Sequence, residues 1–402
     1  MTVKPEKKSF RLRTLTPVFV GSGEQVKPVA YYIDRENKKL HVLNFSKLME
    51  RLNKTQKDAL LEYLESLMHA KKRDTEFSLN QFFENQNLLS ADEQFIAKTR
   101  QYQLSFTHPP ERLGFHACIK RIGHSPCIPG SEIKGAFRTA YLHYLLKNET
   151  KLFNEYQASL QELQKLMENS TDFNNRKIEK KFEKISEKLE NSAFRGKNSD
   201  AKFDVLRFFQ FQDTYAKPQY MRLEMTQSDL ENPNTRVWLE CIAPNAEITL
   251  YVTFFDIKEK YRGELGLQRF DDWSLDHFLT VCHERAKDVL EEESEFFKDK
   301  EEITALIENL KKENTPQTPF LRLGMGQGFL STTINLLLAQ KNEELYKNSI
   351  QQGLKKAWPN RYGKIRIGEF PKTRRVVIGA DGRPTSLLGW VQIVPRQTAS
   401  NA

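Results

Sequence analysis

The stretch IPGSEIKGAFRTAYLHYLL, from Ile128 to Leu146, begins with residues that start helices and continues with a helical pattern of apolar side chains. Ser131 has the position of a helix N-cap, so we expect the first turn to present free backbone N–H groups and the positive end of the helix dipole. Lys134 and Arg138 are expected one turn apart on the outer side. Two cations beside a helix N-terminus favour a phosphate site, and the alternative is an ordinary capped helix with solvated cations. The side chains expected to face the core are Ile133, Ala136, Phe137, Ala140, Tyr141 and Tyr144.

The composition is that of a soluble globular protein whose charge favours acidic partners. The chain has 402 residues, enough for two or three domains, and a formal net charge of +9. That charge favours nucleic acid, an acidic membrane surface or an acidic protein. The basic N-terminus lacks the apolar segment of a secretory signal, and no apolar run is long enough to span a bilayer. Four cysteines without regular spacing do not form a secreted disulfide framework, so we expect a cytoplasmic protein.

Strand and helix patterns alternate along the first half of the chain. From Ser9, apolar residues alternate with Arg11 and Arg13, as in a half-buried strand, and VFVGSGEQV predicts a glycine turn. A strand pair is predicted in VAYYIDRENKKLHVLN, reversed at Asp34 to Asn37. Residues 46–102 are expected to be helical. Residues 146–191, rich in Glu, Lys and Gln, are interpreted as a helical insertion on the surface, and NSAFRGKNSD as a loop.

The second half of the chain returns to strands before its longest helices. KFDVLRFFQFQDT predicts a strand, and VWLECIAPNAEITLYVTFF predicts a hairpin broken at Pro244 and Asn245. Helices are expected from Asp272 to Lys312, then strand, glycine loop and helix in TPFLRLGMGQGFLSTTINLLLAQ. Short strands are expected in KIRIGEF, RRVVIG and LLGWVQIV. Because short turns join several strand pairs, we expect an α+β fold with an antiparallel sheet.

A second glycine cluster, Gly324, Gly326 and Gly328, lies in LRLGMGQGFLSTT beside Arg322. Neither this cluster nor IPGSEIKG has the spacing of a nucleotide-binding motif. Alternating glycines allow a backbone to lie close against a flat or bulky group. The alternative interpretation is a tight connection between a strand and a helix.

Basic and aromatic residues alternate near the C-terminus, which favours contact with RNA, although a charge run is more commonly a solvated surface. The basic residues are Lys364, Arg366, Lys372, Arg374 and Arg375, and the aromatic residues are Tyr362, Phe370 and Trp390.

Histidine and cysteine residues raise a metal alternative and an enzyme alternative. His116, Cys118, His124 and Cys127 lie in one short stretch, so a zinc site is sterically possible, but their spacing matches no standard finger. Structural roles for these residues are the simpler interpretation. A ribonuclease would need a histidine general base, for which His124 and His143 are candidates. No serine or cysteine nucleophile with a recognisable elbow is present.

Four motifs in order resemble the RAMP proteins of type III CRISPR effector complexes. They are TLTPVFVGSGE, IPGSEIKGAFRTA, RLGMGQGFLSTT and FPKTRR. Their order in a chain of this length is similar to the type III-A subunit at the 3′ end of the guide RNA. The resemblance implies a ferredoxin-like (RRM-like) core that binds the guide without cutting it. Residues 1–258 would form the N-terminal domain, with insertions near 46–102 and 146–191, and residues 259–402 a C-terminal α+β domain carrying the glycine loop.

The resemblance also implies partners and contact residues. The implied partners are crRNA, other Csm effector subunits, above all the backbone RAMP subunit, and host nucleases; no cofactor, metal or membrane is expected. One departure is Glu132, where the family commonly has serine, and its carboxylate is expected to compete with phosphate. A repeat-processing endoribonuclease of the same superfamily is the alternative function. The implied RNA contacts are Gly21, Ser22, Gly23, Gly130, Ser131, Lys134, Arg138, Arg322, Gly324, Gly326, Gly328, Lys372, Arg374 and Arg375.

Overall fold

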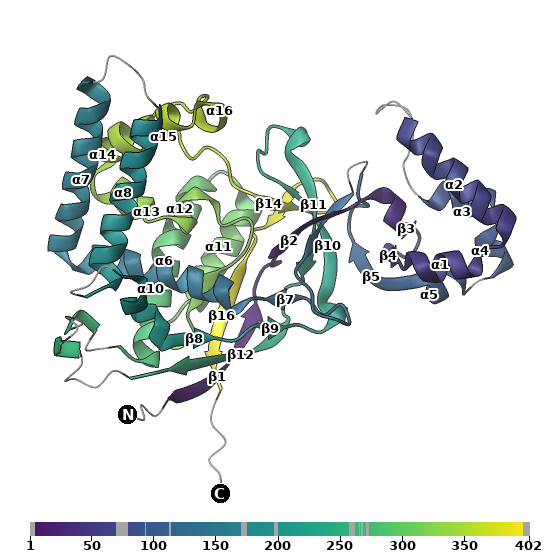
Figure 1. The fold of residues 1–402 in the computed structure, drawn as a ribbon, viewed down its shortest axis with the longest axis horizontal. Coiled ribbons are helices and arrows are strands. Elements are labelled where there is room, and N and C mark those ends of the chain that lie inside the picture. The colour runs from purple at the N-terminus through teal and green to yellow at the C-terminus, as the bar shows by residue number, and fades with distance from the viewer. Residues whose placement is uncertain are drawn as a thin grey trace, which may run out of the picture.

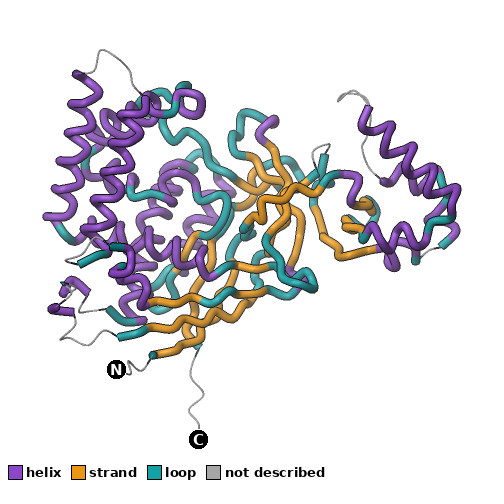
Figure 2. The backbone as a smooth tube through the Cα atoms, in the orientation of Figure 1, coloured by secondary structure: helices purple, strands orange, loops and turns teal. Residues whose placement is uncertain are grey.

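The protein has a mixed α+β fold, in which helices lie on both sides of curved sheets (Figures 1 and 2). The α+β class expected from the sequence is therefore confirmed. The computed structural model describes residues 5–69, 79–92, 94–111, 114–169, 175–196, 200–256, 262–264, 266, 268–270 and 273–396. In that part of the chain, no helix is long and apolar enough to cross a membrane.

A five-stranded sheet has the order β13-β16-β1-β12-β8, and all its pairings are antiparallel. Phe10 and Leu12 are buried on one face of β1 whereas Arg11 and Arg13 are half-buried on the other, which confirms the predicted alternation. The strands are β1 (Glu6–Thr14), β8 (Phe209–Phe211), β12 (Glu247–Phe254), β13 (Phe320–Arg322) and β16 (Trp390–Pro395).

Two long helices cover the buried face of this sheet. They are α6 (Gly130–Asn148) and α10 (Leu275–Phe296). The Phe137 ring of α6 lies 4.8 Å from that of Phe278 in α10, and Phe278 lies 6.4 Å from Phe10 of β1. Without its insertions, the chain therefore runs β1, α6, β8, β12, α10, β16. Because β16 pairs with β1, the sheet combines residues from both sides of the boundary expected at residue 258.

A nine-stranded sheet has the order β2-β6-β11-β10-β5-β4-β3, with β14 and β15 attached to β10. It contains two parallel pairings, β10 with β5 and β11 with β6, so the predicted antiparallel arrangement is right for the five-stranded sheet and wrong for part of this one. A separate pair is formed by β7 (Cys127–Ile128) and β9 (Thr214–Tyr215). The nine strands are β2 (Gly21–Val26), β3 (Tyr31–Asp34), β4 (Lys39–Leu43), β5 (Arg100–Phe106), β6 (Phe115–Cys118), β10 (Met221–Gln227), β11 (Arg236–Ile242), β14 (Val376–Ile378) and β15 (Pro384–Ser386).

The hairpin predicted at Pro244 and Asn245 is wrong, although both of its strands exist. Strand β11 belongs to the nine-stranded sheet and β12 to the five-stranded sheet. Asn245 has a positive φ of 63°, and its N–H donates to the backbone oxygen of Thr14. The Thr14 hydroxyl accepts from the N–H of Ala246 at 2.8 Å. These bonds attach the connection to the end of β1, so the chain changes sheets instead of reversing.

The helical region predicted for residues 46–102 forms a lobe with its own core. Its helices are α1 (Phe45–Arg51), α2 (Lys54–His69), α3 (Leu79–Asn85), α4 (Leu88–Ala91) and α5 (Phe95–Thr99). Leu48, Leu60, Phe82, Phe83 and Phe95 are buried together in it. Residues 70–78 and 93 of the predicted range lie outside the described part of the chain, and the predicted helical region is confirmed for the described residues up to Thr99. It ends there because the next residues pair with β4 as strand β5.

The insertion predicted for residues 146–191 is a helical hairpin, which Figure 1 shows at the left. It consists of α7 (Thr150–Asn169) and α8 (Asn175–Phe194). Leu160, Leu163 and Ile185 belong to the main core. The predicted loop NSAFRGKNSD is wrong at its start, because Ala193 and Phe194 are fully buried and keep the last turn of α8 helical.

The C-terminal third is mainly helical before its last strands. Its helices are α11 (Glu301–Glu313), α12 (Gly328–Thr332), α13 (Asn335–Lys341), α14 (Glu343–Leu345), the π-helix η7 (Tyr346–Gln351), α15 (Gln352–Ala357) and α16 (Pro359–Tyr362). The strand predicted in KIRIGEF is wrong: Lys364, Arg366 and Glu369 are exposed and the backbone forms turns. Most of KFDVLRFFQFQDT is likewise not strand, because the 3-10 helices η2 (Ala201–Phe203) and η3 (Val205–Phe208) precede β8.

Candidate nucleic-acid interface

Helix α6 begins one residue after Pro129, which has the extended conformation of an N-cap. Ser131 is the second helical residue, so its predicted N-cap role is wrong. The N–H of Gly130 donates to Asp213 Oδ1 at 2.7 Å. One of the free amides at this helix tip therefore already has a carboxylate partner, which weakens the tip alone as a phosphate site.

Glu132 joins the first turn of α6 to the glycine loop, residues 324–328. Its Oε1 accepts from the N–H of Gly324 at 2.7 Å and from Gln327 Nε2 at 3.4 Å. We expected this carboxylate to compete with phosphate. Because loop donors occupy its Oε1, Glu132 instead holds two distant sequence motifs together.

Lys134 lies two residues after Glu132 in α6, so its side chain is on another side of the helix, where its charged neighbours are Arg138, Asp204 and Arg207. It is half-buried, and we find no ion pair or hydrogen bond from its ammonium group to any described residue. Burial lowers the pKa of Lys134; Asp204 opposes this effect, whereas the charges of Arg138 and Arg207 lower the pKa further. An anion bound here would offset the repulsion among three neighbouring cations.

Arg138, in contrast, is engaged within the protein. Its guanidinium donates to Asp204 Oδ2 at 2.8 Å and to Glu190 Oε2 at 2.9 Å. It also lies 4.1 Å from the ring centroid of Phe194. Arg138 therefore joins α6 to α8 and to η3. No local sequence signal indicated these partners, because both carboxylates lie more than fifty residues away along the chain.

The glycine loop packs against the segment that follows β1. Gly324, Gly326 and Gly328 have positive φ of 69°, 102° and 72°. Met325 N–H donates to Phe19 O at 2.9 Å. A Cβ on Gly324 would lie 2.0 Å from that same oxygen, so the close approach requires glycine.

The first glycine motif lies beside this loop but forms a strand instead of the predicted turn. Strand β2 begins with Gly21, Ser22 and Gly23, and all three residues are exposed. Ser22 Oγ donates to Ala117 O at 3.1 Å. Through Phe19, the motif adjoins the glycine loop. We call residues 19–23, 130–134 and 324–328 the three-motif junction.

Arg322 and Arg374 lie inside the protein and not at its surface. Both contact Glu293 Oε1, Arg374 Nε at 2.8 Å and Arg322 Nη1 at 3.3 Å. All three residues are at least 94% buried. The Arg322 guanidinium also lies 5.3 Å from the ring centroid of Trp390, which is buried and offers no stacking surface. These arginines therefore hold the core, and a bound strand would not reach them.

The remaining residues of the FPKTRR motif differ in exposure. Arg375 is half-buried and donates to Thr226 Oγ1 at 3.0 Å, whereas Lys372 is exposed. Phe370 packs against Phe329 with ring centroids 4.9 Å apart. Of the predicted basic C-terminal contacts, Lys372 is thus the one that a ligand reaches most directly.

His143 is buried in α6 and cannot act as a base on a surface-bound RNA. Arg285 Nη1 lies 2.9 Å from its Nδ1, and because arginine only donates, Nδ1 must accept. Nε2 then carries the proton and donates to Asp288 at 2.7 Å. Burial lowers the pKa of His143 to about 4. The candidate role of His143 as a general base is therefore wrong.

This buried histidine predicts a pH dependence of stability. An unfolded histidine takes a proton near its ordinary pKa of 6.5, whereas folded His143 does so only near pH 4. The free energy of unfolding should therefore be highest above pH 6.5 and fall below it, by about 2 kcal/mol at pH 5. Urea denaturation of wild type and His143→Gln from pH 5 to 8 isolates this contribution. Equal pH dependence in both proteins would contradict it.

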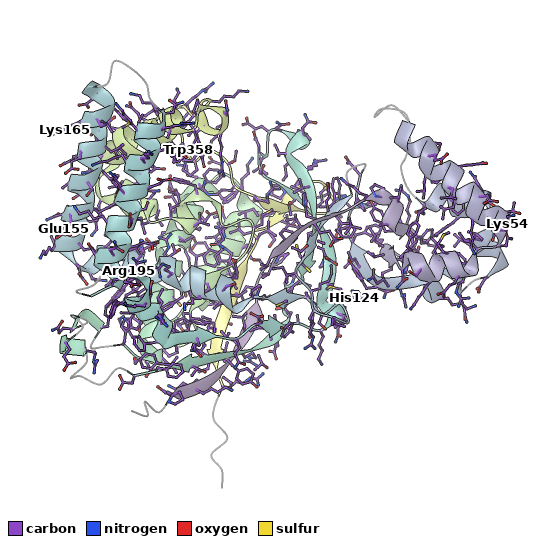
Figure 3. The ribbon with its side chains drawn as sticks, in the orientation of Figure 1. Lys54, His124, Glu155, Lys165, Arg195 and Trp358 are labelled. Carbon is purple, nitrogen blue, oxygen red and sulfur yellow. The ribbon has the colours of Figure 1, made fainter. Side chains whose placement is uncertain are left out.

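The cysteines and the other histidines show no metal cluster in the described part of the chain. Cys118 and Cys127 are buried free thiols, and no group of three or more His, Cys, Asp or Glu side chains could hold a metal there. His124 stacks on Tyr102 with ring centroids 4.9 Å apart, and burial lowers its pKa. Figure 3 shows His124 well away from Trp358 and the α7–α8 hairpin.

The fold and the three-motif junction together agree with one protein family. Residues 11–331 match the model of the RAMP superfamily, and the chain belongs to this superfamily. Membership implies a ferredoxin-like core, and the strand order β16-β1-β12-β8 with helices α6 and α10 has the connectivity of such a fold.

Over nearly its full length the chain is a distant homologue of Csm5. The CRISPR system protein Csm5 of Methanocaldococcus jannaschii is 23% identical over 407 residues, covering 94% of this chain and 87% of that protein. A chain in the cryo-EM structure of a type III-A Csm–crRNA–target RNA ternary complex matches with TM-score 0.65 and 21% identity, covering 96% of this chain and 100% of that one. The crystal structure of T. onnurineus Csm5 matches with TM-score 0.64 and 20% identity, covering 95% and 99%.

Proposed function

We propose that this protein is a non-catalytic, crRNA-binding subunit of a type III-A CRISPR Csm complex. It would contact the 3′ end of the guide, cap the filament of backbone RAMP subunits, and support crRNA maturation, with host nucleases as further partners, in antiviral defence. The similarity to Csm5 over nearly the whole chain supports membership in such a complex. Strands β1, β8, β12 and β16 and helices α6 and α10 would form the ferredoxin-like core.

The observation that carries the RNA-binding proposal is the three-motif junction. The Glu132 contact to Gly324 and the Met325 contact to Phe19 bring three separate motifs to one place. Backbone without side chains allows a ribose-phosphate strand to approach closely, and Lys134 supplies a cation to which no anion among the described residues is bonded. We therefore assign phosphate contact to Lys134, with Lys372 as a second exposed cation, and leave buried Arg322 and Arg374 out of the interface.

Removing the Lys134 charge should weaken RNA binding and reduce its salt dependence. In Lys134→Ala, affinity for a single-stranded guide should fall almost independently of base sequence, because phosphates carry no sequence information. The slope of log K against log salt should become shallower by about 0.7, the value for one phosphate contact on a single strand. Fluorescence anisotropy at several salt concentrations measures both quantities.

Lys54→Ala provides a charge-matched control, because Lys54 begins α2 in the helical lobe, which lies apart from the body that contains α6 (Figures 1 and 3). Its salt slope should equal that of the wild type. An unchanged slope in Lys134→Ala, or the same change in both variants, would remove the phosphate contact. In the same assay the guide should be recovered intact, and cutting that disappears in His124→Ala would favour the endoribonuclease alternative.

A further inference from the structure

A cavity of about 370 Å³ lies between α6, the α7–α8 hairpin and the C-terminal helices. Its apolar wall includes Tyr156, Phe182, Phe329, Leu354 and Trp358. This volume falls in the range of about 300–1,000 Å³ typical of sites for small molecules. Because the exposed residue Thr332 also lines it, the cavity communicates with solvent.

The cavity wall is suited to a flat, weakly polar group. The ring centroids of Phe182 and Trp358 lie 5.7 Å apart with planes inclined at 31°, and Trp358 Nε1 donates to Glu179 Oε1 at 3.2 Å. Thr139 and Ser186 also line the cavity, and the Thr139 hydroxyl, which donates to Gly135 O at 3.2 Å, can accept a bond from a ligand. An aromatic surface with a few hydrogen-bonding groups binds a nucleobase by stacking on its face and bonding to its edge.

Two segments of the three-motif junction are followed along the chain by residues that line this cavity. Arg138 and Thr139 line it from the turn of α6 that follows Lys134. On another side, α12 starts at Gly328, the last glycine of the loop, and contributes Phe329 and Thr332 to the wall. A strand whose phosphate contacts Lys134 would lie one turn of α6 from Arg138 and Thr139 in the cavity wall.

We propose that this cavity accepts one unstacked nucleobase of the bound RNA strand. The proposal rests on the proposed RNA-binding function and adds a base site to its phosphate site. Trp358 and Phe182 supply the stacking surface, and Thr139 and Ser186 face the base edge. Because stacking accepts every base, the site confers little sequence preference and instead fixes the position of the strand.

Tryptophan fluorescence can test this site, because Trp358 is half-buried whereas Trp238, Trp273 and Trp390 are each at most 7% exposed. An oligouridylate of guide length should quench the Trp358 emission on binding. An abasic oligomer of the same length, which keeps every phosphate, should bind through charge alone and leave that emission unchanged. The quenched component should be missing in Trp358→Phe.

Affinities of two variants complete the test. Trp358→Ala should bind the oligouridylate about tenfold more weakly and the abasic oligomer as the wild type does, because only the stacking surface is lost. Trp358→Phe retains an aromatic ring and should keep most of the affinity, which separates stacking from a folding defect.

The outcomes distinguish this proposal from the proposed function. If the wild type binds both oligomers equally and the variants do not differ, the base site is wrong while RNA binding stands. If neither oligomer binds at low salt, both proposals fail. Quenching of Trp358 by purified effector subunits but not by RNA would assign the cavity to a protein segment and overturn the base site.

Discussion

Glu293→Gln should lower the free energy of unfolding by about 3–5 kcal/mol, the cost of removing one partner from a buried ion pair. Glu293 is 2% exposed, and its Oε1 contacts the side chains of both Arg374 and Arg322. The amide keeps the shape of the side chain but removes the anion that Arg322 and Arg374 share, and it leaves Arg374 only its pair with Glu292 at 3.5 Å. Urea denaturation followed by circular dichroism at neutral pH measures the change.

Glu295→Gln is the matched control, because Glu295 lies two residues further along the same helix and its side chain is exposed. It pairs with exposed Lys298 at 2.7 Å. Exposed pairs contribute little, so a change below about 1 kcal/mol is expected. Similar losses in the two variants, or a loss below about 1 kcal/mol in Glu293→Gln, would show that the buried arginines do not depend on Glu293.

The sequence predicted individual strands, turns and helices well where neighbouring residues alone determine which side chains are buried. The alternation around Phe10 and Leu12 identified β1, and turn residues identified the β3–β4 reversal at Asp34, whose Oδ1 accepts from the N–H of Asn37. The helical spacing of apolar residues also predicted α6, and the Glu-, Lys- and Gln-rich composition predicted the helices of residues 146–191. Each of these signals depends on neighbours within about one or two turns of the chain.

The pairing of strands was not predictable in the same way. A strand followed by Pro244, Asn245 and another strand has the pattern of a hairpin, but the bonds of Thr14 direct β12 into a different sheet. Thr14 lies more than two hundred residues away. Likewise, nothing in the sequence near Phe194 indicated that the main core would bury it and extend α8.

The candidate site shows the same division between local and distant information. The sequence identified the motifs that meet at the three-motif junction and placed Lys134 outside the core. It could not distinguish Lys134 from Arg138, because the difference lies in Asp204 and Glu190, which accept hydrogen bonds from Arg138 and not from Lys134. It also assigned Arg322 and Arg374 to RNA, since their partner Glu293 lies in α10, distant from both along the chain. Whether a basic side chain can bind RNA depends on whether the fold brings a carboxylate from a distant part of the chain next to it.

Gly130→Ala should destabilise the protein by about 3 kcal/mol, at the upper end of the usual cost of overpacking. A Cβ on Gly130 would lie 2.1 Å from the backbone oxygen of Phe211, which cannot rotate away as a side chain could. The helix tip would have to move from β8, and the Gly130 bond to Asp213 would lengthen. The free energy of unfolding in urea measures the effect.

Gly135→Ala is the control on the same helix, because nothing lies within 4 Å of a Cβ at Gly135. It should stabilise the protein by about 0.5–1 kcal/mol, since alanine is the better helix former. Comparison of the two variants distinguishes two possible reasons for glycine at position 130, namely the close contact with Phe211 and the approach of a phosphate. If Gly130 were needed only to let a phosphate approach, Gly130→Ala would keep wild-type stability and lose RNA affinity alone. The close contact with Phe211 requires that stability is lost even without RNA.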